Sequence, residues 1–217
     1  SFKNFKIILI YDDDDLEEYL YIKKIFKNKI HIIKNKKNLG VGVSRNKGIY
    51  NSKSKYIAFC DADDIWVKDK LAKQIKYMDN LKLDFTHTSY FIINEKNKKI
   101  GKMNIKKKLT YSDLLKSCDI GLSTVIIKTK ILKKNLFKSL KTKEDFALWL
   151  QLLRKNIKIT GLQEYLSSWR KSSNSLSSSS YQKISDAFIL YNKYEKFDKI
   201  LSFFLTLRLS IYFIVKL

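Results

Sequence analysis

Proline is absent from this chain of 217 residues, and cysteine occurs only as Cys60 and Cys118. Two cysteines cannot form a disulfide framework, and Cys60 falls inside an apolar run that we expect to be a buried strand, so the composition favours a reducing compartment. The opening residues 1–6 contain no apolar run of the kind found in a secretory signal. These scarcities predict a cytoplasmic protein and exclude a disulfide-stapled secreted scaffold.

Acidic residues are also few. The chain has 21 of them against 44 lysines and arginines, which gives a formal net charge of +23. Such a charge permits anionic partners, namely nucleic acid, nucleotide phosphates or an anionic membrane face. The lysines are scattered among asparagine and isoleucine rather than gathered with aromatic residues, which argues against a surface that reads nucleic acid.

Short apolar runs and amphipathic stretches alternate along the first 60 residues. Strands are expected over residues 7–11, 30–33 and 56–60, and helices over residues 16–26 and from the glycine-bearing loop 38–48 to Asn51. This order is typical of right-handed βαβ units. It predicts an α/β fold with a mostly parallel sheet flanked by helices.

Helix and strand patterns continue to about residue 176. Helices are expected over residues 66–78 and 143–153 and after a capping box at residues 110–113, a hairpin over residues 85–105, and strands over residues 122–127 and 157–160. Serines fill residues 177–180 and read as a linker. We therefore expect one domain over residues 1–176 and a helical extension over residues 177–217.

The extension ends in an apolar stretch, residues 200–217, that is interrupted by Arg208 and Lys216. A membrane-spanning helix needs about 20 predominantly apolar residues, so this segment is marginal. We expect a helix that lies on the membrane surface, with neighbouring lysines attracted to anionic lipid. The alternative is a helix packed on the domain or on a second subunit.

Three carboxylates, those of Asp61, Asp63 and Asp64, directly follow the apolar run at residues 56–60. In open α/β sheets the functional crevice lies beyond the carboxyl ends of the strands. Asp61 and Asp63 can direct oxygens at one hard cation, Mg²⁺ or Mn²⁺, which keeps its other positions for water and substrate phosphates. The alternative is a polar cap, with Asp63 or Asp64 as the N-cap of the next helix.

Two further acidic groups stand at the ends of expected elements. Residues 12–15 are four aspartates after the first strand, and Glu144 with Asp145 opens the helix over residues 143–153. Carboxylates in a first helical turn complement the macrodipole by about 0.3–1 kcal/mol, which is a purely structural explanation for the second group.

Taken together, these motifs resemble the family 2 glycosyltransferases, which have a GT-A fold and use nucleotide-diphosphate sugars. The resemblance runs from Ile7 to about Ser177. It rests on the strand and aspartate pair at residues 8–13, the glycine and Arg-Asn loop at residues 38–48, the DxD strand at residues 56–66 and the Glu-Asp helix at residues 144–150. Trp169 and Arg170, with Ser173 and Ser175, resemble a downstream segment on the phosphate side.

The resemblance implies roles for these side chains. Asp12 or Asp13 is expected to bind the base, Arg45 and Arg170 the nucleotide or its diphosphate, Asp61 the ribose or the water shell of the metal, and Asp63 the metal itself. Asp145 is expected to be the general base of a single inverting displacement. Glu144 is expected to position the acceptor or Asp145.

The chain also departs from the family pattern. The family begins with an earlier strand and a Pro-x-Tyr-Asn-like turn, whereas this proline-free chain starts at the equivalent of the second strand. We expect either an incomplete version of a longer protein or the loss of that strand. Lysine and serine at residues 171–173 replace a histidine that the family often has, and His31 and His87 are expected to be strand residues rather than ligands.

The leading hypothesis is an inverting transferase, dependent on Mn²⁺ or Mg²⁺, that moves a sugar from a nucleotide-diphosphate donor, expected to be a UDP-sugar, to a cell-surface glycan or lipid-linked acceptor. It is expected to act in the cytoplasm, at the inner face of the cell membrane. One alternative is a non-catalytic relic or fragment with an incomplete donor site. The other is a basic module that binds membrane surfaces or nucleic acid.

Overall fold

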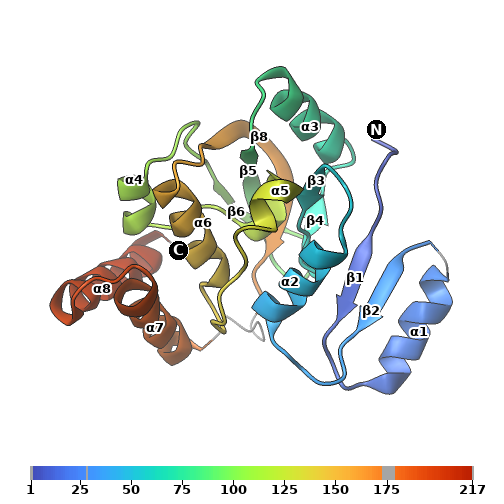
Figure 1. Ribbon diagram of the computed structural model, residues 1–217, viewed down its shortest axis with the longest axis horizontal. Coiled ribbons are helices and arrows are strands. Elements are labelled where there is room, and N and C mark those ends of the chain that lie inside the picture. Colours follow the sequence, from blue (N-terminus) through green and yellow to red (C-terminus); the bar gives the residue numbers. More distant parts are fainter. Residues whose placement is uncertain (1, 28, 173–178, 217) are drawn as a thin grey trace.

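A small parallel sheet and its helices form the first part of the protein. The computed structural model describes residues 2–27, 29–172 and 179–216. The first elements are β1 (Ile8–Tyr11), α1 (Leu16–Phe26), β2 (His31–Lys34) and α2 (Val41–Asn51), and β1 and β2 pair in parallel. Figure 1 shows α1 on one side of this pair and α2, with the larger sheet, on its other side. The βαβ start is therefore as predicted.

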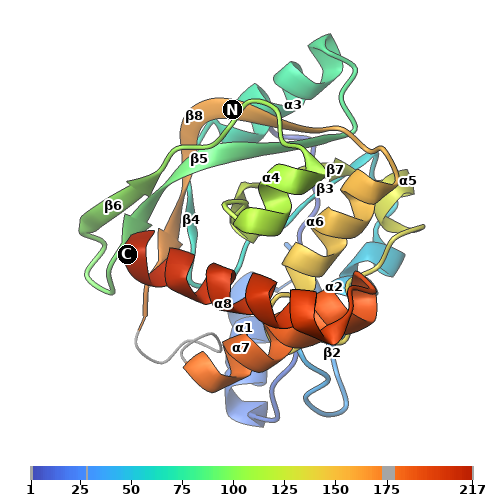
Figure 2. The ribbon, with the colours of Figure 1, turned by 90° about the vertical axis from the view of Figure 1, so that its left-hand side faces the viewer.

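A second, six-stranded sheet forms the centre of the molecule. Its strands are β3 (Tyr56–Ala58), β4 (Ile65–Trp66), β5 (Phe85–Ile93), β6 (Lys99–Met103), β7 (Ile126–Lys128) and β8 (Ile159–Arg170). They lie in the order β3-β7-β5-β8-β4, with β6 paired to β5. Figure 2 shows β5, β6 and β8 side by side in this sheet.

Helices cover both sheets. The remaining ones are α3 (Lys70–Asn80), α4 (Tyr111–Lys116), the short 3₁₀ helix η1 (Leu122–Thr124), α5 (Thr129–Leu132), α6 (Glu144–Arg154), α7 (Ser180–Ile189), the π-helical turn η2 (Leu190–Tyr194) and α8 (Lys199–Lys216). The capping box before α4 is present as expected, formed by Thr110 and Asp113. The α/β class, with a sheet flanked by helices, is confirmed.

The strand directions are more mixed than the sequence predicted. Among the described residues, the pairings β1–β2 and β5–β8 are parallel, whereas β3–β7, β4–β8, β5–β6 and β5–β7 are antiparallel. The run at residues 56–60 is not a doubly buried parallel strand, because β3 is a half-buried edge strand that ends at Ala58 and leaves Cys60 exposed. An apolar run records burial but not strand direction, which depends on distant partners.

Four expected boundaries were wrong. The helix expected from Trp66 begins at Lys70, because Ile65 and Trp66 pair with β8 as a short strand. Residues 122–124 form a 3₁₀ turn before β7, and the strand expected at residues 157–160 is the start of the longer β8. Ser179 is not part of a linker, since its hydroxyl accepts a hydrogen bond from Gln182 and caps α7.

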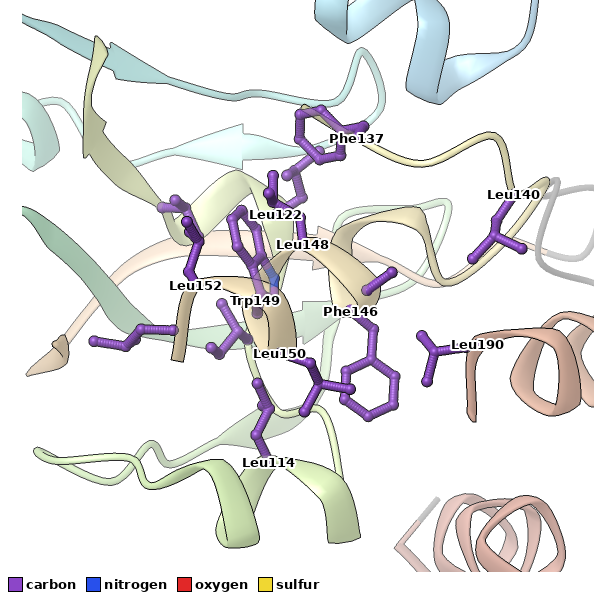
Figure 3. Close-up of a cluster of buried hydrophobic side chains, with 14 of the residues drawn as sticks. Leu114, Leu122, Phe137, Leu140, Phe146, Leu148, Trp149, Leu150, Leu152 and Leu190 are labelled. Atoms are coloured by element: carbon purple, nitrogen blue, oxygen red, sulfur yellow. The ribbon is translucent and has the colours of Figure 1, made fainter. Parts of the chain in front are cut away.

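Helix α6 is the centre of the hydrophobic core. Seven of its eleven residues are buried, which are Glu144, Phe146, Ala147, Leu148, Trp149, Leu150 and Leu152. Figure 3 shows the apolar ones, with Phe146, Leu148, Trp149, Leu150 and Leu152 labelled, among side chains from surrounding elements. The ring of Trp149 lies 4.9 Å from that of Phe85 in β5, centroid to centroid. Because α6 is packed on several sides, its first turn is a rigid platform for the acidic residues it carries.

The C-terminal helices share this core. Ala187, Leu190, Tyr191 and Leu209 belong to the same buried cluster as α6. The hydroxyl of Tyr191 donates a 3.0 Å hydrogen bond to the carbonyl of Leu115 near α4. A division into a domain over residues 1–176 and an extension over residues 177–217 stays a prediction.

Two glycines of α2 provide a matched test of the contact between α2 and the segment that leads to α6. A Cβ at Gly42 would lie 2.8 Å from the backbone carbonyl oxygen of Lys138, whereas at Gly48 the nearest atoms are side-chain carbons of Ile10 at 3.7 and 3.9 Å. We expect Gly42→Ala to lower the free energy of unfolding by about 1–3 kcal/mol through overpacking. Gly48→Ala should leave it unchanged or raise it by up to about 1 kcal/mol. Urea unfolding measures both, and a Gly42→Ala protein as stable as the parent would contradict this packing.

Candidate active site

Arg45 joins three segments that are far apart in the sequence. From α2, its guanidinium donates to the carboxylate of Asp61 at 2.9 Å and to that of Glu144 at the start of α6. Its side chain is 15% exposed, and its Cζ lies 5.6 Å from the centre of the Phe137 ring. Burial alone would lower the pKa of Arg45, but the carboxylates of Asp61, Glu144 and Asp145 outweigh it and raise the pKa. The arginine therefore remains a cation between the loop of residues 61–64, which we call the acid loop, and α6.

Glu144 and Asp145 occupy the first turn of α6. Glu144 is 6% exposed, and one carboxylate oxygen of Asp145 accepts a 2.7 Å hydrogen bond from the Phe146 amide. Burial raises the pKa of both carboxyls, and Arg45 opposes that rise. A carboxylate with a raised pKa is a better proton acceptor than an ordinary one. The pair thus does more than complement the helix macrodipole.

The turn into α6 requires an unusual backbone. Lys143, which precedes Glu144, has the left-handed conformation with a φ of 67°. A lysine in this region is uncommon and costs conformational energy. The turn directs the chain from the surface into the buried helix, so that both acids come directly after it.

The loop of residues 61–64 is held from two sides. The Ser123 hydroxyl accepts a 3.0 Å hydrogen bond from the Asp61 amide, and the Ser123 carbonyl accepts one of 2.8 Å from the Trp66 indole. Asp64 accepts a 2.9 Å hydrogen bond from the Arg170 amide, and burial raises its pKa to about 6. Asp63 is exposed. The N-cap of α3 is Asp69, so the alternative of Asp63 or Asp64 as that cap is wrong.

Arg170 stabilises this loop in the structure. Its guanidinium donates to the carbonyls of Asp63, Asn94 and Glu95 and to the side chain of Asn97. It thereby connects the acid loop to the turn between β5 and β6. Its contact with a nucleotide stays a prediction. Ser173 and Ser175, from the same motif, lie outside the described residues.

Asp12 and Asp13 lie at the end of β1, and only Asp12 is part of a wider network. Its carboxylate accepts hydrogen bonds from the side chain of Asn35 at 2.7 Å and from the Leu39 amide at 2.8 Å. Asp13 is exposed and accepts a 3.2 Å hydrogen bond from the amide two residues on. Asp12 thus fixes the loop that leads into α2.

Two buried residues near the site, Asn35 and Lys70, were not predicted from the sequence. Asn35 is 1% exposed and connects Asp12 to α2, since its amide also donates to the Ser44 hydroxyl and its oxygen accepts from Lys47. The only sequence feature that could have indicated Asn35 is its place as a polar residue directly after an expected strand. Lys70 is 0% exposed and resembled an ordinary surface lysine of an amphipathic helix.

The buried Lys70 lies beside Trp66, which follows the acid loop. Its ammonium donates to the Gln74 side chain at 2.5 Å and to the Thr124 carbonyl at 3.2 Å, and it lies 4.9 Å from the centre of the Trp66 ring. Burial lowers its pKa to about 7. Its hydrogen bonds join α3 to the segment at Thr124, next to Ser123, so its part is structural.

A divalent cation fits this site only with help from a ligand. Within residues 2–27, 29–172 and 179–216, no group of three or more His, Cys, Asp or Glu side chains is placed to hold a metal. Asp63 offers an exposed hard oxygen, while Asp61 is already paired with Arg45. Mg²⁺ and similar ions are often held by one or two carboxylates, with water and phosphates as the other ligands. The donor set suits such an ion.

The structure therefore brings together Arg45, Asp61, Glu144 and, through its charge, Asp145. That Asp63 and Asp145 face one substrate stays a prediction. His31 and His87 lie in β2 and β5, as predicted. His87 is fully buried, and burial lowers its pKa to about 3.

Solved structures share this fold. Residues 1–349 of S. aureus TarS, in complex with UDP-GlcNAc, match with a TM-score of 0.67 at 18% identity, and the match covers 91% of this chain and 60% of that one. The fold is thus of the GT-A type.

Sequence comparison gives the family. Residues 1–141 match the family described as Glycosyl transferase family 2. The Bacillus subtilis protein TuaG, named as a glycosyltransferase of teichuronic acid biosynthesis, is 31% identical over 87% of this chain and 77% of its own length. Escherichia coli WfaP, named a UDP-Glc:α-D-GlcNAc-diphosphoundecaprenol β-1,3-glucosyltransferase, is 34% identical over 85% of this chain and 72% of its own. This chain belongs to glycosyltransferase family 2.

Proposed function

We propose that the protein is an inverting, divalent-metal-dependent glycosyltransferase that transfers a sugar from a UDP-sugar to a lipid-linked or cell-surface glycan acceptor. The observation that carries the proposal is the double ion pair of Arg45. It ties Asp61 of the acid loop to Glu144, the neighbour of Asp145. One cation thereby connects the loop of residues 61–64 to the helical turn that carries the candidate base.

The proposed reaction is one displacement. Asp145 accepts the proton of an acceptor hydroxyl, whose oxygen attacks the anomeric carbon of the donor sugar. The bond from that carbon to the diphosphate breaks, and the nucleotide diphosphate leaves with the electron pair, which inverts the configuration. A divalent cation bound at Asp63 would neutralise charge on that leaving group. Asp12 or Asp13 would contact the base, and Arg45 or Arg170 the phosphates.

The named relatives support the choice of substrates. The name of WfaP gives UDP-glucose as its donor and a diphosphoundecaprenol-linked sugar as its acceptor, and the TarS structure contains UDP-GlcNAc. A lipid-linked acceptor would place the enzyme in the cytoplasm, at the inner face of the membrane. This chain spans 60% of the length of the TarS structure. The activity of the whole protein is therefore proposed together with its substrates.

Calorimetry with UDP tests the donor site. We expect the protein to bind UDP at least about tenfold more tightly with Mn²⁺ than with EDTA, and Asp63→Asn to remove that difference, because the amide is neutral and a poorer ligand for a hard cation. The matched control is Asp69→Asn, an acid whose side chain is 43% exposed and whose surface pair with Lys73 contributes little. It should bind UDP as the parent does.

Two outcomes would contradict the assignment. An Asp63→Asn protein that keeps the Mn²⁺ effect would show that the metal is held elsewhere. A parent protein that binds no UDP, with or without Mn²⁺, would favour the non-catalytic alternative. Transfer of sugar from UDP-sugars to a lipid-diphosphate acceptor, followed in the same preparations, distinguishes binding from turnover.

A further inference from the structure

Helix α8 packs Leu209 into the core but also exposes large apolar side chains on its outer face. Ser202 is 0% exposed and Thr206 is 5% exposed, whereas Ile200 is 72%, Phe203 58% and Phe204 60% exposed. A surface helix normally turns its apolar stripe to the core and its polar face to water. Here the inner face combines Leu209 with the small polar Ser202 and Thr206, and a second set of large apolar side chains faces outwards.

The inward hydroxyls of α8 are satisfied without a partner element. Thr206 donates to the carbonyl of Ser202 at 2.8 Å, and Ser210 donates to that of Thr206 at 2.9 Å. Hydrogen bonds of this kind allow small polar side chains to be buried against a neighbouring helix. Because these hydroxyls have acceptors within the helix, α8 can bury them without a further partner on its inner face.

The outward side chains form one continuous line. Ile200, Phe204, Leu207 and Ile211 are spaced by four, three and four positions, so they lie along one face of the helix. With Phe203 beside them they make up what we call the apolar stripe of α8, and each is at least 47% exposed. Figure 2 shows α8 on the outside of the molecule, in front of α7.

The stripe has the chemistry of a helix that lies in a membrane surface rather than one that crosses it. Among the described residues, no helix has both the length and the apolarity to cross a bilayer. The exposed Arg208 lies at the flank of the stripe, and the exposed Lys196 and Lys199 lie at the start of the helix. Basic side chains at such positions reach the headgroups while the apolar face sits at the acyl boundary.

Charge distinguishes a lipid surface from a second copy of the chain. Two copies joined through their apolar stripes would bring the basic residues of both flanks near one another, which is unfavourable between like charges. An anionic lipid surface attracts the same residues and also the net charge of +23. The apolar and the basic parts of α8 thus favour the same occupant.

We propose that the apolar stripe of α8 docks flat onto an anionic lipid bilayer. The evidence for docking comes from α8 alone. The purpose of docking, which is to bring the active site to a lipid-linked acceptor, rests on the proposed function.

Vesicle binding tests this docking without any sugar substrate. The parent protein should co-sediment with vesicles of phosphatidylcholine mixed with phosphatidylglycerol, and more weakly with phosphatidylcholine alone. The double variant Phe204→Ser with Leu207→Ser should bind the mixed vesicles at least about tenfold more weakly, since each lost side chain removes apolar burial. Both positions are exposed, so the thermal unfolding midpoint should stay that of the parent.

The matched control is Leu20→Ser with Tyr21→Ser. These residues are 54% and 64% exposed on α1, on the other side of the molecule in Figure 1. The control should bind vesicles as the parent does. Equal losses in the two double variants, or no binding by the parent, would overturn the proposal.

Sedimentation in the absence of lipid tests whether a second copy of the chain binds the stripe instead. A parent dimer that becomes monomeric in the α8 variant would assign the stripe to a second copy instead. Failure of the UDP experiment would leave vesicle binding intact, so the two proposals fail separately.

Discussion

Replacing Asp145 by asparagine is expected to lower the rate of sugar transfer by about 10²–10⁴-fold, the usual range for loss of a general base. Asparagine preserves the shape of the side chain and can still accept the hydrogen bond from the Phe146 amide. It cannot accept the proton of the acceptor hydroxyl. The affinity for UDP should change little, because the proposed donor contacts lie elsewhere. Initial rates with saturating donor, together with calorimetry, separate the two effects.

The pH profile gives a second readout for Asp145. Burial raises its pKa above the ordinary aspartate value of 3.8. Since the base must be deprotonated, transfer by the parent enzyme should fall as the pH drops through this raised pKa, and the residual activity of Asp145→Asn should lack that limb. Asp69→Asn is the control and should retain the parent profile. A variant that transfers sugar within twofold of the parent rate would remove Asp145 from the mechanism.

Much of the fold could be predicted from local patterns. The hairpin expected over residues 85–105 is formed by β5 and β6, and the helix expected to end at Asn51 does so. These elements are set by the period of their apolar residues and by local capping, which the sequence displays directly. Strand direction was not predictable in this way, since β3 pairs antiparallel with β7 some 70 positions later.

The candidate site required more than local pattern. Arg45 and Glu144 are 99 positions apart, and only the resemblance to a family connected them in advance. The burial of Lys70 was hidden, because it depends on which neighbour the helix packs against. Periodicity shows that a helix has two faces, but it does not show which one the fold covers.

Replacing Arg45 by methionine is expected to lower the free energy of unfolding at neutral pH by about 3–5 kcal/mol, which is typical when one partner of a buried ion pair is removed. The side chain of Glu144 is 8% exposed and bears most of this cost, whereas that of Asp61 is 38% exposed and can be hydrated. Methionine keeps the apolar contact with Phe137 but leaves the carboxylate of Glu144 buried without its cation. Urea unfolding measures the loss.

The loss should depend on pH in a direction that identifies its cause. Arg45 opposes the rise in the pKa of Glu144, so without it that pKa rises further and the carboxyl takes up a proton more readily in the folded state. Folding of the variant then binds more protons than folding of the parent, and its deficit should shrink as the pH is lowered. The exposed Arg208 supplies the control, since Arg208→Met should stay within about 0.5 kcal/mol of the parent. A deficit for Arg45→Met that is the same at acid and neutral pH would mean that lost packing, and not an uncompensated carboxylate, is responsible.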